Sequence, residues 1–90
     1  MITIHKYPLD RVEKTMIDIP HSSKFLHFGY GPNEELSIWF QVDDQAWKTH
    51  RFFRLIGTGW SLDPRWVYMQ SIVVHPYVWH LYELTAAPDA

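Results

Sequence analysis

The sequence predicts a small all-β domain, an antiparallel sandwich or barrel of about six to seven strands. Short segments rich in β-branched and aromatic residues recur along the chain at a spacing of about 8–12 residues. Turn-forming residues separate these segments, and no segment longer than a turn or two has the periodicity of a helix. Because nearly all connections are short, neighbouring strands are expected to be largely antiparallel.

The first half of the chain contains the strands Ile2–Tyr7, Lys14–Ile19, Lys24–Tyr30 and Leu36–Val42. A proline follows each of the first two strands. The turn residues of Gly29–Asn33 stand between the last two, which predicts that these two form a hairpin. Apolar residues occupy every second position of the fourth strand, so one of its faces is expected to lie in the core.

The second half contains the strands Thr49–Ile56, Trp66–Val74 and Tyr77–Leu84, of which the last two are joined by His75-Pro76. The connection Gly57–Arg65 is longer than the others. In it a single helical turn can start at Pro64, with Asp63 as its cap. We expect one β domain over residues 1–84 and a flexible tail over residues 85–90.

Composition narrows the class of protein. The 90 residues include no cysteine, which removes thiolate catalysis, thiolate zinc sites and disulfide scaffolds, and favours a reducing, cytoplasmic setting. No apolar run approaches the roughly 20 residues of a membrane-spanning helix, and the N-terminus lacks the apolar core of a signal peptide. The formal charge of −2 argues against binding of extended nucleic acid, which needs many phosphate contacts.

Aromatic residues are unusually abundant. Five Trp, five Tyr and five Phe in 90 residues exceed what one small core can hide. Both faces of Thr49–Ile56 are substantially apolar, and no expected helix covers the second face. The sequence therefore predicts a homo-oligomer, a dimer or tetramer that buries an apolar sheet face, or a stacking pocket, or both.

Residues for catalysis or metal binding are present but poorly arranged. The histidines are His5, His21, His27, His50, His75 and His80, and their spacing matches no metal site. The serines lack the context of a nucleophile elbow, and the acidic pairs Glu34-Glu35 and Asp43-Asp44 fall at expected turns. We therefore expect no enzyme activity, no metal and no cofactor.

The segment Arg51–Trp60 is the strongest candidate for ligand binding. Alternation places Arg51 and Arg54 on opposite faces of one strand. In the loop that follows, the glycines let backbone N–H groups approach an anion, the Thr58 hydroxyl adds a donor, and the Trp60 indole offers a stacking surface. Together these groups suit a phosphate and a base. The alternative is ordinary packing beside a turn that requires glycine.

The last strand supplies further candidates. Trp79 and Leu81 are expected on one face, and His80 and Tyr82 on the other. A core or interface strand is the alternative, because aromatic strands usually bury their rings. The predicted ligand-binding residues are thus Tyr7, Arg51, Arg54, Thr58, Gly59, Trp60, Trp79 and His80.

Four sequence patterns carry a family resemblance. They are Ile4-x-Lys6-Tyr7-Pro8-Leu9, Trp39 with Val42-Asp43, Arg51-x-Phe53-Arg54-x-x-Gly57-Thr58-Gly59, and Val78-Trp79-His80-x-Tyr82-Glu83. In these the chain resembles, from Ile4 to Glu83, a family of small phage and prophage proteins known chiefly as a domain of unknown function. Trp60, directly after Gly-Thr-Gly, departs from the pattern.

The resemblance implies a function in the host cytoplasm. Small, β-rich, oligomeric phage proteins include inhibitors of bacterial immunity, and some are sponges that sequester the cyclic nucleotide signals of CBASS or Thoeris defence without cleaving them. We therefore expect a protein that binds a small phosphorylated ligand, most simply a cyclic dinucleotide. The alternatives are a protein-interaction inhibitor of a host defence or transcription protein, and a minor structural protein of the virion.

Overall fold

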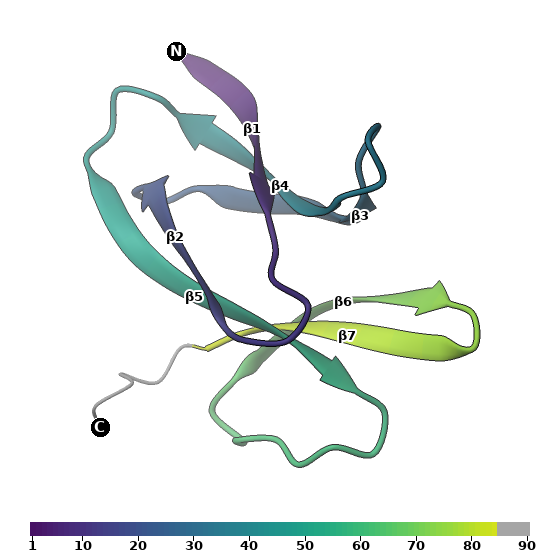
Figure 1. The fold of residues 1–90 in the computed structure, drawn as a ribbon. Coiled ribbons are helices and arrows are strands. Elements are labelled where there is room, and N and C mark those ends of the chain that lie inside the picture. Colours follow the sequence, from purple (N-terminus) through teal and green to yellow (C-terminus); the bar gives the residue numbers. More distant parts are fainter. Residues whose placement is uncertain (85–90) are drawn as a thin grey trace.

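Residues 1–84 are described by the computed structural model, and they form seven strands without a helix. The strands are β1 (Ile2–Pro8), β2 (Thr15–Pro20), β3 (Lys24–Tyr30), β4 (Leu36–Asp43), β5 (Lys48–Gly57), β6 (Val67–Val74) and β7 (Tyr77–Glu83). They make two antiparallel sheets, β1-β4-β3 and β2-β5-β7-β6 (Figure 1). The prediction of an all-β antiparallel sandwich is confirmed. The tail expected at 85–90 lies outside the described residues.

β4 is the central strand of the three-stranded sheet. It forms the expected hairpin with β3 and also pairs with β1, from Ile2↔Asp43 to Pro8↔Ser37. The apolar side chains at every second position of β4 face the core, as predicted. The inward-facing side chains, which are at most 5% exposed, are Leu36, Ile38, Phe40 and Val42.

β5 is the strand that holds the four-stranded sheet together. Its first half pairs with β2, and its second half pairs with β7, so that Phe53 has a partner on both sides. The β6–β7 hairpin, joined by His75-Pro76 as expected, is attached to the sheet through β7 alone (Figure 1). This hairpin therefore projects past the C-terminal end of β5.

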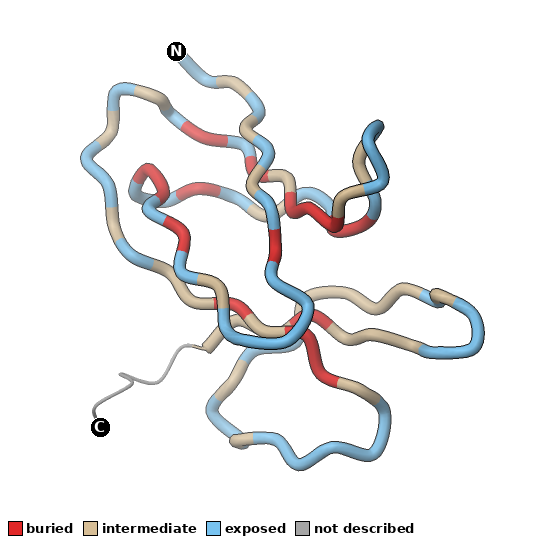
Figure 2. The backbone as a smooth tube through the Cα atoms, in the orientation of Figure 1, coloured by how far each residue is buried: buried red, intermediate tan, exposed pale blue. Residues whose placement is uncertain are grey.

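The core lies between the two sheets. From β5 it takes Phe53 and Leu55, and from β7 it takes Leu81, the register partner of Leu55. The rings of Phe53 and Phe40 meet across the sheets with centroids 5.7 Å apart. Figure 2 shows the buried residues, in red, on strands of both sheets. The alternate residues of β5 therefore lie on the other face of the four-stranded sheet, which we call its outer face.

A side chain joins the edge strands of the two sheets. The Gln70 side chain on β6 accepts a hydrogen bond from the backbone N–H of Phe28 at 3.0 Å and donates one to the Phe28 carbonyl at 2.6 Å. The amide thus binds β3 as a peptide group of a neighbouring strand would. It links the sheets at a point where no backbone ladder does so.

The single turn expected at Pro64 is present, but as a hydrogen-bonded turn and not as part of a helix. The backbone N–H of Trp66 donates to the Asp63 carbonyl at 3.0 Å, which closes a single turn, and β6 begins at Val67 immediately afterwards. No length of chain remains for a helix. Asp63 still accepts hydrogen bonds from the turn, because its carboxylate contacts the Arg65 backbone N–H at 2.9 Å.

The Asp63 turn should be sensitive to strong acid. Hydrogen bonds from the Arg65 side chain, and then from its backbone, lower the pKa of Asp63 from 3.8 to about 2. Since the folded pKa is depressed, the stabilisation is present above pH 4 and is lost as the pH falls through about 2. We expect the Asp63 carboxyl carbon to titrate in NMR spectra near pH 2, together with the Arg65 amide.

Asp63→Asn provides the control, because it should abolish the acid transition of the Arg65 amide. A carboxyl midpoint at or above 3.8 would show that the contact with Arg65 does not persist in solution.

Nothing in residues 1–84 forms a helix with the length and apolar character needed to span a lipid bilayer.

Candidate functional site

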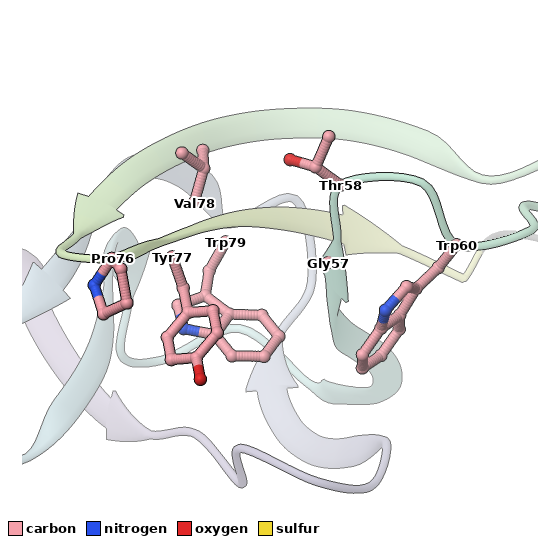
Figure 3. Close-up of a pocket in the computed structure, with 7 residues that line it drawn as sticks. All are labelled: Gly57, Thr58, Trp60, Pro76, Tyr77, Val78 and Trp79. Carbon is pink, nitrogen blue, oxygen red and sulfur yellow. The ribbon is translucent and has the colours of Figure 1, made fainter.

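A pocket lies where β5 ends beside β7. The ladder between these strands stops at Gly57↔Trp79, so the next residues of β7, Val78 and Tyr77, have no β5 residue opposite them. The cavity has a volume of about 490 Å³ (Figure 3). Its lining residues are Gly57, Thr58, Trp60, Pro76, Tyr77, Val78 and Trp79.

Three aromatic rings form one side of the pocket. Trp60 meets Trp79 edge to face with centroids 5.8 Å apart, and Tyr77 lies 6.1 Å from Trp79 at an angle of 39°. All three rings project to the same side of β7 (Figure 3). Trp79 packs against the core, whereas Trp60 is 50% and Tyr77 62% exposed. The anchored ring therefore holds two exposed rings at the mouth of the pocket.

The two loop glycines have different structural roles. A Cβ atom on Gly57 would lie 2.8 Å from Cε2 of Trp60, so only glycine lets the indole lie this close to the strand. Gly59 has a φ of 92°, in the region that side chains disfavour, and its Cβ position is open. Gly57 thus positions Trp60, and Gly59 shapes the loop.

Polar groups meet on the opposite side of β7, where Thr58 projects away from the rings (Figure 3). The Thr58 hydroxyl lies 2.9 Å from Nε2 of His80, and Nδ1 of His80 lies 2.6 Å from the Ser71 hydroxyl. The Tyr68 hydroxyl lies 2.8 Å from that of Ser71. We call these four residues the polar array. It fixes the imidazole ring through both of its nitrogens.

Arg54 shares the outer face with the polar array. Its register partner on β7 is Tyr82, two residues from His80 on the same face. The Tyr82 ring packs edge to face against Tyr68, with centroids 5.6 Å apart. Arg54 is therefore a neighbour of the array on the sheet surface.

Arg51 lies elsewhere, on the inner face of β5. Its Nε and Nη2 atoms donate to the two carboxylate oxygens of Glu83, each at 2.7 Å, and Nη1 donates to the Ser23 carbonyl at 3.0 Å. Its guanidinium carbon also lies 5.0 Å from the centroid of Phe40. These partners engage the whole guanidinium, so Arg51 holds strands together and does not line the pocket.

Tyr7 also lies away from the pocket, in the three-stranded sheet. Its ring packs against Phe40 with centroids 6.3 Å apart, and its hydroxyl lies 3.2 Å from Nδ1 of His5. Burial, with a smaller contribution from the Asp18 carboxylate, raises the pKa of Tyr7. Tyr7 is thus half-buried and packs against the core of the sandwich.

The structure thus brings five of the eight predicted residues to the end of β5, on the two sides of β7. These are Thr58, Gly59, Trp60, Trp79 and His80. Sequence reasoning missed Tyr77, although it lies two residues before Trp79 on the same face. It also missed Tyr68 and Ser71, because a bulge after Tyr68 puts both on one face although they are three residues apart.

No cluster of three or more histidine or acidic side chains that could hold a metal ion occurs within residues 1–84.

The fold and site define a class: a small two-sheet β domain with an aromatic pocket at the open end of a central strand. The chain belongs to the family described as Domain of unknown function (DUF7352), whose model matches residues 1–90. No curated protein and no solved structure matches the chain.

Proposed function

We propose that this protein binds and sequesters a small ligand that carries a planar base and a phosphate, of the cyclic nucleotide type, without cleaving it. The supporting observation is the pocket, where three aromatic rings and the Gly57–Gly59 loop meet. In the biological setting that we propose, the protein acts in the host cytoplasm as a phage-encoded sponge for an immune signal.

The chemistry of the pocket suits such a ligand. Stacking of a base on an aromatic side chain contributes about 1–3 kcal/mol and tolerates any base. The exposed rings of Trp60 and Tyr77 offer such surfaces. The Thr58 hydroxyl, which contacts His80 on the other side of β7, is a polar contact for a phosphate beside the pocket. Arg51 is excluded from this role by its pairing with Glu83.

The size of the pocket bears on the form of the ligand. Its volume of about 490 Å³ is in the lower half of the range for small-molecule sites. We therefore propose that one copy holds one base, and that a cyclic dinucleotide engages two copies of the chain. Exposed apolar residues on the outer side of β1, Ile2 at 62% and Ile4 at 61%, provide a surface through which copies can associate.

The proposal is tested by incubating the protein with cyclic di- and trinucleotides and cyclic ADP-ribose isomers, removing unbound compounds by filtration, and analysing what heat releases. We expect one compound to be retained and recovered intact. Trp60→Ala should weaken its binding about 5- to 150-fold, since a stacking surface is lost. Trp47→Ala is the matched control, because Trp47 is 65% exposed and stacks on His21, outside the pocket lining.

Other outcomes of this experiment contradict the proposal. Recovery of an altered compound would show an enzyme, and retention of no compound would remove the nucleotide hypothesis. Equal loss of binding in both tryptophan variants would remove the pocket from the model.

A protein-interaction inhibitor is the second candidate. Exposed Trp60 and Tyr77, held by the anchored Trp79, also have the character of an interface hot spot. In that case Trp60→Ala should abolish capture of a host protein while the ligand panel gives no binding.

A further inference from the structure

The side chain of Arg54 has an unusual environment. Its Nε is the one buried side-chain nitrogen or oxygen among the described residues that lacks a hydrogen-bond partner. A guanidinium is charged at every physiological pH, and an unsatisfied buried N–H group is costly. Because such groups are rare, the environment of Arg54 calls for an explanation. Nε itself is buried, so an outside partner would contact the terminal nitrogens of the guanidinium, which form no hydrogen bond within residues 1–84.

The contrast with Arg51 on the same strand shows that the fold can satisfy an arginine fully. Glu83 gives Arg51 two hydrogen bonds on the inner face. On the outer face, the residue opposite Arg54 is Tyr82, and the acidic residue of β2 on this face, Asp18, lies beside His50 at 3.7 Å. Within residues 1–84, no carboxylate forms an ion pair with Arg54.

Basic groups extend along the sheet on both sides of Arg54. Lys14 lies over the ring of Phe52, with Nζ 5.4 Å from its centroid, and Phe52 is the next residue of β5 on the outer face. On the other side is His80, a diagonal neighbour across the β5–β7 ladder. Diagonal neighbours in a sheet lie about 7–8 Å apart, within reach of a long side chain.

Hydroxyl groups complete the arrangement. The Ser71 and Thr58 hydroxyls flank His80 at 2.6 and 2.9 Å, and Tyr68 lies beside Ser71. Hydroxyl, imidazole and guanidinium donors on one surface are the usual partners of a phosphate oxyanion. Both ring nitrogens of His80 already face hydroxyls, so the hydroxyl groups are what the polar array offers to the anion that Arg54 binds.

We propose that the outer face of the four-stranded sheet carries a phosphate-binding site centred on Arg54, with His80 and Ser71 beside it on the same face. The ligand class is a small compound with a phosphoryl group. Since Thr58 lines the aromatic pocket and also contacts His80, the site is placed to hold the phosphate of a ligand whose base lies in the pocket. The assignment of this phosphate to a ligand bound in the aromatic pocket rests on the proposed function.

The test uses inorganic phosphate on the whole chain, with chloride at equal ionic strength as the reference. We expect the Arg54 Nε–H signal in NMR spectra to shift when phosphate is added. The Arg51 Nε–H signal should not shift, because that group already donates to the Glu83 carboxylate. Arg54→Gln should weaken phosphate binding about tenfold or more, and Arg54→Lys, which keeps the charge but loses the fork of donors, should do so less.

Arg11→Gln is the matched control, because Arg11 is exposed and its guanidinium donates to the Tyr30 hydroxyl at the end of β3, in the other sheet. An Arg54 signal unmoved by phosphate, or equal weakening by Arg11→Gln and Arg54→Gln, would overturn the site.

The ligand panel separates the phosphate site from the proposed function. Phosphate binding without nucleotide retention supports the site and removes the proposed function, and nucleotide retention that is unaffected by Arg54→Gln removes the site alone.

Discussion

Replacement of Arg51 by methionine is expected to lower the free energy of unfolding by about 2–4 kcal/mol. The loss comes from Glu83, whose carboxylate would keep its position between the strands without the two 2.7 Å hydrogen bonds it now accepts. The side chains are 24% and 18% exposed, so partial solvation places the cost below that of a fully buried pair.

The position of the Arg51–Glu83 pair explains why its loss should destabilise several strands at once. Glu83 is the last residue of β7 and lies opposite Phe53, while Arg51 lies two residues earlier on β5 and also holds the Ser23 carbonyl at 3.0 Å. One guanidinium thus connects β5, β7 and the turn between β2 and β3. Its position over the ring of Phe40 adds contact with the other sheet.

Urea unfolding of the two single variants and the double variant measures the effect. Arg51→Met and Glu83→Leu should each destabilise, and the double variant should regain much of the loss, because an apolar pair leaves no charge unpaired. A loss under about 0.5 kcal/mol for Arg51→Met, in the range of an exposed pair, would show that solvent screens the interaction.

Replacement of Phe40 by alanine should cost more, about 3–5 kcal/mol. Phe40 is 0% exposed. Its ring contacts Tyr7, Phe25 and Phe53 at centroid distances of 6.3, 6.0 and 5.7 Å, which brings together strands of both sheets. A domain of this size has roughly 5–10 kcal/mol of stability in total, so the variant should be near its unfolding threshold at room temperature.

Thermal and urea unfolding of a graded series check this expectation. Phe40→Leu should lose less than Phe40→Ala, because it leaves a smaller cavity. Phe25→Ala is the matched control, since Phe25 packs against the core but is only partly buried. If Phe25→Ala cost as much as Phe40→Ala, the centre of the core would lie elsewhere.

The sequence predicted the strands well because their signals are local. Period-two alternation in Leu36–Val42 depends only on neighbouring residues, and all four inward side chains are buried as expected. The pairing of β1 with β4 and of β2 with β5 is different, because each joins segments separated by two other strands. No local pattern specifies such pairs, so the sequence did not predict which strands share a sheet.

The residues of the candidate site likewise fall into those that local sequence signals predict and those that depend on non-local packing. Thr58 and Trp60 are near neighbours in the sequence, and β7 brings Trp79 and His80 to them through an adjacent ladder. Alternation correctly separated Arg51 from Arg54, but it cannot say which face is inner, and that depends on where Phe40 of the other sheet lies.

The contact between Gln70 and Phe28 has a consequence for the behaviour of the protein at high concentration. β3 is an edge strand, and an edge with available N–H and C=O groups is a template on which strands of other molecules can assemble into fibrils. At Phe28 both groups are occupied by one glutamine amide. An incoming strand would first have to displace that amide. The Gln70 side chain therefore protects the edge of β3 at Phe28 against the addition of strands from other molecules.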